Sequence, residues 1–250
     1  MTNDTKYLTP ESETVEAAMK SGDNVHVFRQ EKQVFLRKFT VFIGFEPKGE
    51  TNAPKGEGVI LYPGAKVEPE KYSPIARSLA ELGYHVAIVD FAFEFAFTNY
   101  KRADDVLSHI SWKGVVKRWI LSGHSLGGVM ACAYAKDFAD DKEKLKGVAL
   151  LASFPSDSEK FFYGQLKGLG LKVSSIWGSK DGLTTGEKIE DSKSELPSDT
   201  HFFEIVGGNH TQFYYSDKLQ DKDIEADISL NDQQIQIRKA MHELLMQVTE

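Results

Sequence analysis

The sequence is poor in cysteine: Cys132 is the only one among 250 residues. A single cysteine cannot form an internal disulfide or a thiolate zinc cluster, so disulfide scaffolds and zinc-finger classes are excluded. We expect Cys132 to be a small buried residue and not a reactive thiol. Basic residues are also in the minority, 30 against 37 acidic ones, which gives a net charge of −7. Such a surface repels phosphate backbones and anionic lipid, which argues against nucleic acid as a partner.

Long hydrophobic runs are absent too. No stretch approaches the ~18 apolar residues of a membrane span, and the polar segment Met1 to Lys6 lacks the apolar run of a signal peptide. Hydrophobic residues nevertheless make up 41% of the chain, enough for a sizeable core. We therefore expect a soluble, cytoplasmic protein, with a polar lead over residues 1–24 and a single domain over residues 25–250.

Hydrophobic patterning predicts an α/β fold. Val25, Val27, Val41 and Ile43 belong to alternating segments, which are typical of half-buried strands at an antiparallel N-terminal edge. Short apolar runs, typical of strands buried on both faces, follow at 58–62, 85–89, 119–121, 147–151, 171–177 and 202–206. Helical spacing recurs at 72–82, 99–110 and 126–138, and again from about residue 232. This alternation predicts a mostly parallel, twisted sheet with helices on both faces.

One pentapeptide carries a chemical signal, Gly123-His124-Ser125-Leu126-Gly127. The G-x-S-x-G pattern arises by chance in about one chain of this length in ten, so its context decides its meaning. Here a predicted buried strand ends at Ser122 and a predicted helix begins near Leu126. A serine on such a sharp turn is strained, exposes its hydroxyl and lies at a helix N-terminus that favours a developing negative charge. Ser125 is therefore the candidate nucleophile.

A serine hydroxyl is a poor nucleophile without a base, so the pattern requires a histidine elsewhere. His210 lies in the loop just past the predicted strand 202–206, as a catalytic side chain on a scaffold would. His201 opens that strand and His242 lies in the last helix, so both also have ordinary structural interpretations. We favour His210 as the base.

The acid of the site is predicted in the same way. Asp181 follows the strand 171–177 at the carboxyl edge, where open α/β sheets place their sites. Asp157, after the preceding strand, is the alternative. The chain order Ser125, Asp181, His210 is the order of α/β-hydrolases.

Two backbone donors are needed for the oxyanion of an acyl-transfer intermediate. The residue after the nucleophile, Leu126, supplies the first. The second is expected from the loop after the strand 58–62, with the Ala65 N–H favoured and the Lys66 N–H as the alternative. Lys66 also lies where its ammonium group would favour substrates that carry a carboxylate.

Taken together, four segments resemble the α/β-hydrolase superfamily, and more narrowly the small serine hydrolases akin to dienelactone hydrolases. They are Tyr62-Pro63-Gly64-Ala65-Lys66-Val67, Gly123-His124-Ser125-Leu126-Gly127-Gly128, Gly178-Ser179-Lys180-Asp181-Gly182, and Gly207-Gly208-Asn209-His210 with Gln212-Phe213. The resemblance implies the α/β-hydrolase fold and the triad, but no particular substrate, because dienelactone hydrolases use a cysteine where this chain has Ser125. Many relatives carry an N-terminal membrane anchor, so a trimmed extracytoplasmic protein is the alternative location.

The substrate pocket has several candidates. Phe91 and Phe93, in an alternating aromatic run after the strand 85–89, either line an acyl pocket or cap the core, and Tyr214 follows the base closely. Leu151 and Leu171 are 20 positions apart, too few for a separate lid domain, although the short helix expected around 161–163 could cover the site. The run 221–232 faintly mimics a calcium loop but has Ala226 where glycine is needed, so no metal is predicted.

These observations predict a serine hydrolase that cleaves carboxylic esters or thioesters through an acyl-enzyme. The partner is a small-molecule ester with a short acyl chain, and neither a metal nor an organic cofactor is required. An acyltransferase with the same triad is one alternative, and a ligand-binding or regulatory module on a hydrolase scaffold is another.

Overall fold

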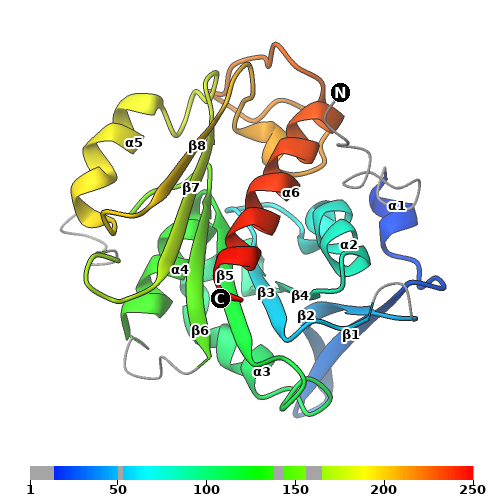
Figure 1. Ribbon diagram of the computed structural model, residues 1–250. Helices are drawn as coiled ribbons and strands as arrows, with labels where there is room; N and C mark the ends of the chain where they lie inside the picture. The colour runs from blue at the N-terminus through cyan, green and yellow to red at the C-terminus, as the bar shows by residue number, and fades with distance from the viewer. Residues whose placement is uncertain (1–13, 50–52, 138–143, 156–164, 250) are drawn as a thin grey trace.

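An eight-stranded sheet forms the centre of the protein (Figure 1). The computed structural model describes residues 14–49, 53–137, 144–155 and 165–249. The strands run in the order β1-β2-β4-β3-β5-β6-β7-β8. Their bounds are β1 Val25–Val34, β2 Arg37–Pro47, β3 Glu57–Tyr62, β4 His85–Val89, β5 Arg118–His124, β6 Leu145–Leu151, β7 Lys172–Gly178 and β8 His201–Ile205. β2 is antiparallel to β1 and β4, and all pairs from β4 to β8 are parallel. The predicted sheet with an antiparallel N-terminal edge is confirmed.

Helices cover both faces of this sheet (Figure 1). The α-helices are α1 Val15–Ala18, α2 Ser73–Glu81, α3 Ala103–Leu107, α4 Leu126–Asp137, α5 Gly186–Ser192 and α6 Leu230–Gln247. On one face, α2 and α6 bury side chains such as Ile75 and Met241 in a common core. On the other face, α3 and α4 bury Val106 and Met130 in a second core. No helix in these described ranges is long and apolar enough to cross a bilayer.

Two segments differ from the predicted helices. The expected helix over 99–110 is a 3₁₀ turn, Tyr100–Arg102, followed by α3. α3 ends at Leu107, and the Ser108 hydroxyl just beyond it donates to the Asp104 carbonyl at 2.7 Å, a local bond that competes with helix continuation. The short helix α5 was not predicted, because Ile189 is its only buried hydrophobic side chain and a periodic stripe is missing.

Residues 14–24 are the part of the predicted polar lead that the structure describes, and they pack onto α2. Ala18 is fully buried, and its carbonyl accepts a hydrogen bond from Arg77 Nε at 3.0 Å. The Ser73 hydroxyl reaches the Val15 carbonyl at 3.3 Å. Residues 14–24 therefore contribute to packing although they precede the first strand.

The junction of β3 and β5 is the topological switch point of the sheet. α2 follows β3 and packs on one face, whereas α4 follows β5 and packs on the other. The carboxyl ends of these two strands are neighbours, because Tyr62 pairs with Gly123. Such a switch point opens a crevice at the carboxyl edge of an α/β sheet.

Candidate active site

Ser125 occupies a strained turn between β5 and α4. Its φ is +51°, in the left-handed region that non-glycine residues seldom adopt. Its N–H donates to the Leu151 carbonyl at 3.0 Å, and its own carbonyl accepts the Ser153 hydroxyl at 2.7 Å. These two bonds to β6 and the loop after it hold the turn in place and leave the Ser125 side chain half-buried. The predicted nucleophile elbow has the expected local geometry.

The glycines of the elbow permit this close packing. A Cβ at Gly123 would lie 2.4 Å from the Gly127 carbonyl oxygen. A Cβ at Gly128 would lie 2.4 Å from the Ser153 hydroxyl. Both distances are below any real contact, so glycine at these positions allows β5 to approach the start of α4 and α4 to approach Ser153.

His210 and Asp181 form a fully buried pair. His210 Nδ1 lies 2.9 Å from Asp181 Oδ2 and 3.1 Å from Oδ1. Asp181 Oδ1 also accepts the backbone N–H groups of Leu183, at 2.8 Å, and Thr184, at 2.6 Å. These bonds fix the orientation of the Asp181 carboxylate toward His210. Because the pair needs a proton on Nδ1, Nε2 of a neutral His210 is left as the acceptor.

His210 Nε2 is buried and has no hydrogen-bond partner within the described residues. The Ser125 hydroxyl is therefore not hydrogen-bonded to it in this conformation. In structures without substrate, catalytic hydrogen bonds are often long and shorten only in the complex. The structure thus joins the predicted acid to the predicted base and places the predicted nucleophile at the end of β5.

The predicted oxyanion loop lies beside the elbow. The Gly64 N–H donates to the Tyr72 hydroxyl at 2.9 Å, and the Lys66 N–H donates to the Glu94 carbonyl at 3.0 Å. Within the described part of the chain, the N–H groups of Ala65 and Leu126 donate to no acceptor. Lys66, the alternative donor, is thus already engaged, while the two favoured donors are free. The positive φ in this loop falls on Lys66, at +59°.

Sequence reasoning missed a hydrogen-bonded chain behind this loop. The Tyr72 hydroxyl accepts from the Gly64 N–H and lies within hydrogen-bond distance, 2.7 Å, of His124 Nδ1. Burial, reinforced by the neighbouring His210, holds the pKa of His124 well below its ordinary value. Burial likewise raises the pKa of the Tyr72 hydroxyl. Both groups stay neutral, so the chain connects the oxyanion loop to the elbow without a buried charge.

A cavity of about 320 Å³ adjoins the oxyanion loop. It is lined by Ala65, Lys66, Val67, Tyr214, Gln220, Asp221 and Lys222. Lys66 and Tyr214 are thus brought together with the oxyanion donor. The two phenylalanines are placed elsewhere: Phe91 is buried and packs edge-on against Tyr62 at 4.9 Å, and Phe93 is 87% exposed.

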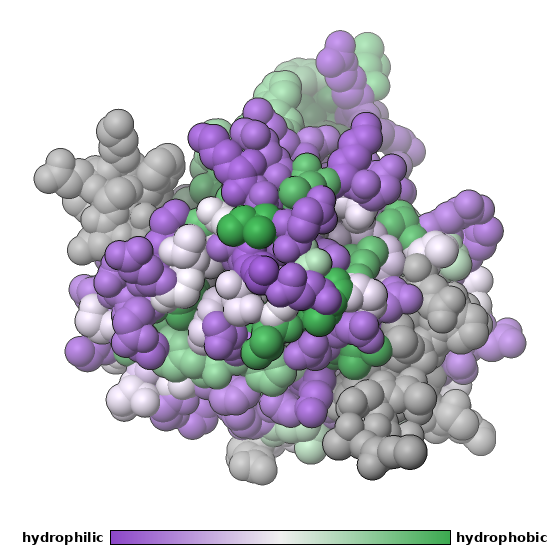
Figure 2. Space-filling view, turned by 90° about the horizontal axis from the view of Figure 1, so that it is seen from above, coloured by the Kyte–Doolittle hydropathy of each residue, from purple (hydrophilic) through white to green (hydrophobic). Residues whose placement is uncertain are grey.

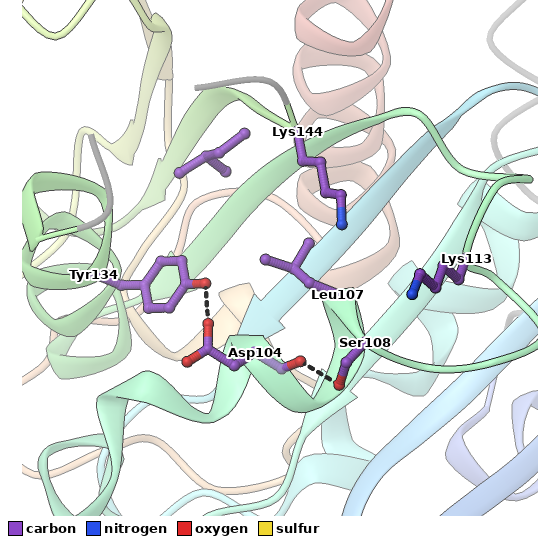
Figure 3. A pocket seen from close by; sticks show the side chains of 7 residues that line it. Asp104, Leu107, Ser108, Lys113, Tyr134 and Lys144 are labelled. Atoms are coloured by element: carbon purple, nitrogen blue, oxygen red, sulfur yellow. Dashed lines mark hydrogen bonds between the residues drawn. The ribbon is translucent and has the colours of Figure 1, made fainter. Parts of the chain in front are cut away.

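A second cavity, of about 340 Å³, lies at the opposite edge of the sheet (Figure 3). Its wall includes residues of α3 and the start of β6, among them Asp104 and Lys144. The Tyr134 hydroxyl donates to Asp104 there, at 2.6 Å. Because the strand ends that carry Ser125 and His210 are at the other edge, this cavity is separate from the candidate site.

The remaining candidates fall into three groups. Cys132 is fully buried, and burial raises the pKa of its thiol to about 12, so it is not a reactive group. Within the calcium-like run, the Asp223 carboxylate is occupied by protein N–H and O–H donors. In the part of the chain that the structure describes, no three histidine, cysteine or carboxylate side chains cluster as metal ligands. Asp157 and the expected helix around 161–163 lie outside the described residues.

The chain belongs to the alpha/beta hydrolase family, whose sequence model matches residues 58–235. This match confirms the resemblance to the α/β-hydrolase superfamily that the four sequence segments indicated. No curated protein matches the sequence.

Solved structures share the fold at low sequence identity. An arylesterase is 15% identical with a TM-score of 0.64, and the match covers 94% of this chain and 90% of that one. A dienelactone hydrolase from Anabaena variabilis is 15% identical with a TM-score of 0.58, covering 90% and 98%. Thermogutta terrifontis esterase 2, phosphoramylated by tabun, is 13% identical with a TM-score of 0.59, covering 90% and 95%.

Proposed function

We propose that this protein is a serine hydrolase of carboxylic esters or thioesters, with Ser125 as nucleophile, His210 as base and Asp181 as the orienting acid. The observation that carries the proposal is the fully buried pair of His210 and Asp181, 2.9 Å apart, with His210 Nε2 left as a free acceptor. The strained turn at Ser125 supports it. So do the esterases among the proteins that share the fold.

The chemistry follows from these groups. His210 Nε2 takes the proton of the Ser125 hydroxyl as its oxygen attacks the substrate carbonyl carbon. The negative charge that develops on the carbonyl oxygen accepts hydrogen bonds from the Ala65 and Leu126 N–H groups. His210 then returns the proton to the departing alcohol or thiol, and the acyl group remains on Ser125. Water, activated by His210 in the same way, releases the acid. Asp181 accepts the hydrogen bond of His210 Nδ1 and holds His210 in the required orientation.

Several features favour short acyl groups. The cavity beside Ala65 is near the lower end of the volumes that hold small ligands. Seen from the carboxyl edge of the sheet, the described surface is a mixture of hydrophilic residues and small, separate apolar patches (Figure 2). An acyl chain that leaves the cavity would therefore meet few apolar partners, and each additional methylene would contribute less than the ~0.8 kcal/mol of full burial. The charged residues that line the cavity are Lys66, Lys222 and Asp221, and their net positive charge favours an acyl group that ends in a carboxylate.

A fluorophosphonate probe and a series of p-nitrophenyl esters from acetyl to palmitoyl test the proposal. We expect labelling on Ser125, kcat/KM highest for short chains, and loss of both labelling and turnover in Ser125→Ala. The matched control is Ser194→Ala, which removes the hydroxyl of an exposed serine that is remote in sequence from Ser125. Absence of labelling would favour the ligand-binding module. Preferential transfer of the acyl group to an added alcohol or thiol would favour the acyltransferase.

A further inference from the structure

One carboxylate, that of Asp223, bonds to the loops of both Asp181 and His210. Asp223 Oδ1 accepts the Gly182 N–H at 3.0 Å and the His210 N–H at 3.3 Å. Asp223 Oδ2 accepts the Thr211 N–H at 2.7 Å and the Thr211 hydroxyl at 2.6 Å. Gly182 directly follows Asp181, so Asp223 holds the backbone next to the acid and the backbone of the base at the same time.

The donor set requires a carboxylate. Four donors converge on the two oxygens of Asp223, and an ionised carboxyl group can accept from all of them. An asparagine would present an N–H group to at least one of these donors, where no hydrogen bond can form. Within this acidic run, the Asp223 carboxylate therefore has a structural role that differs from ion binding.

The backbone around Asp223 is shaped for this contact. Lys222 has a φ of +68°, and its carbonyl approaches Gly182 so closely that a Cβ on Gly182 would lie 2.4 Å away. Two further bonds fasten the same loop to the His210 loop. The Gln220 N–H donates to the Thr211 hydroxyl at 2.9 Å, and Asn209 Nδ2 donates to the Ile224 carbonyl at 2.8 Å.

We propose that Asp223 is a positioning residue that keeps His210 aligned with Asp181 during turnover. The inference rests on the proposed hydrolase function. Base and acid come from separate loops, after β8 and after β7. Two bonds join these loops ahead of the pair, from the Lys180 N–H to the Gly208 carbonyl and from the Gly207 N–H to the Ser179 hydroxyl, both at 2.8 Å. Asp223 adds the bonds to Gly182 and His210 themselves. The Nε2 of His210 must both take and return a proton, and a misplacement of about 1 Å can cost about 10²-fold in rate. Asp223 joins the two loops through their main chains and so prevents that displacement.

Kinetics of Asp223→Ala and Asp223→Asn test this role, with Asp217→Asn as the matched control. Asp217 is exposed on the same loop and makes no hydrogen bond or ion pair with any described residue. For p-nitrophenyl acetate we expect kcat to fall about 10–100-fold in Asp223→Ala and less in Asp223→Asn, while KM changes less than about twofold. Asp217→Asn should match the original protein.

Thermal unfolding and proton NMR complete the experiment. Kinetic assays are run well below the Tm of the least stable variant, where every protein is folded. A fall in kcat that the unfolded fraction alone accounts for would overturn the proposal. The low-field proton signal of His210 Nδ1–H, shared with Asp181, should be present in the original protein and in Asp217→Asn and broadened or lost in both Asp223 variants. An unchanged signal and an unchanged kcat would also overturn it. If the original protein neither turns over esters nor labels at Ser125, the proposed function fails, and the NMR signal still decides the role of Asp223.

Discussion

Replacing Tyr72 by phenylalanine removes one hydroxyl from the centre of the chain that joins the oxyanion loop to the elbow. Two buried groups lose their partner: the Gly64 N–H, at 2.9 Å, and His124 Nδ1, at 2.7 Å. An unsatisfied buried polar group costs about 1–3 kcal/mol. Allowing for partial relaxation, we expect Tyr72→Phe to lower the free energy of unfolding by about 2–4 kcal/mol. For a chain of this size that corresponds to a fall in Tm of about 5–15 °C.

The same change should slow catalysis. Without the hydroxyl, the Gly64 N–H has no acceptor. The loop is still held by the Lys66 N–H on the Glu94 carbonyl, but the adjacent Ala65 N–H, the proposed oxyanion donor, is less well oriented. Deletion of one oxyanion donor costs about 10²–10³ in kcat. A displaced donor still stabilises the oxyanion in part, so the loss should be smaller than for deletion. We expect kcat for p-nitrophenyl acetate to fall about 10–100-fold with little change in KM.

Tyr134→Phe is the matched control for this experiment. Tyr134 is also buried and also loses a hydrogen bond, to Asp104, but it lies at the opposite edge of the sheet. Thermal unfolding and steady-state kinetics are measured on both variants. We expect both to lose stability and only Tyr72→Phe to lose kcat. If the two variants have the same kcat as the original protein, the argument for the oxyanion loop is refuted.

Three further changes have defined outcomes. His124 remains neutral in the folded protein but takes up a proton near pH 6.5 in the unfolded chain. The free energy of unfolding should therefore fall as the pH falls below about 6.5, by up to about 1.4 kcal/mol per pH unit. Urea unfolding between pH 7.5 and 5 should show a shallower decline in His124→Gln, and parallel curves would contradict this reasoning. Asp181→Asn should lower kcat about 10⁴-fold, whereas Asp157→Asn should leave it unchanged; the reverse result would move the acid to the earlier loop. Lys66→Gln should lower kcat/KM about two- to fivefold for monoethyl succinate but not for ethyl butyrate, a difference that 1 M salt should remove if it is electrostatic.

The parts of the site that the sequence predicts are those fixed by local pattern. Strands buried on both faces form continuous apolar runs, and β4 has the predicted bounds. Since parallel strands bring their carboxyl ends to one edge, residues just after those ends, such as Asp181 and His210, are predicted as neighbours without any knowledge of side-chain contacts.

The contacts that the sequence does not predict join residues far apart in the chain. Tyr72 and His124 are 52 positions apart, and Asp223 and Gly182 are 41 apart. Tyr72 has the spacing of an ordinary core residue. Its hydroxyl is seen to have a polar partner only in the fold, which brings the 3₁₀ turn Pro69–Tyr72 next to His124 at the end of β5. Phe93 is exposed and does not line the cavity beside Ala65, for a related reason: it follows β4 in 3₁₀ turns, where alternation along the chain no longer determines which side chains face inward.

The contact between α4 and the oxyanion loop limits how this site can be reshaped. A Cβ on Gly127 would lie 2.3 Å from the Tyr62 carbonyl oxygen and 2.4 Å from that of Pro63, so α4, which follows the proposed nucleophile, packs directly on the loop. Shifting either the helix or the loop to admit a larger substrate would separate the proposed nucleophile, Ser125, from the proposed oxyanion donors. Changes at Tyr214 or Gln220, on the other wall of the cavity, avoid this conflict. To broaden the substrate range, the side chains of that wall are therefore the ones to replace, and the backbone of residues 63–67 should be kept unchanged.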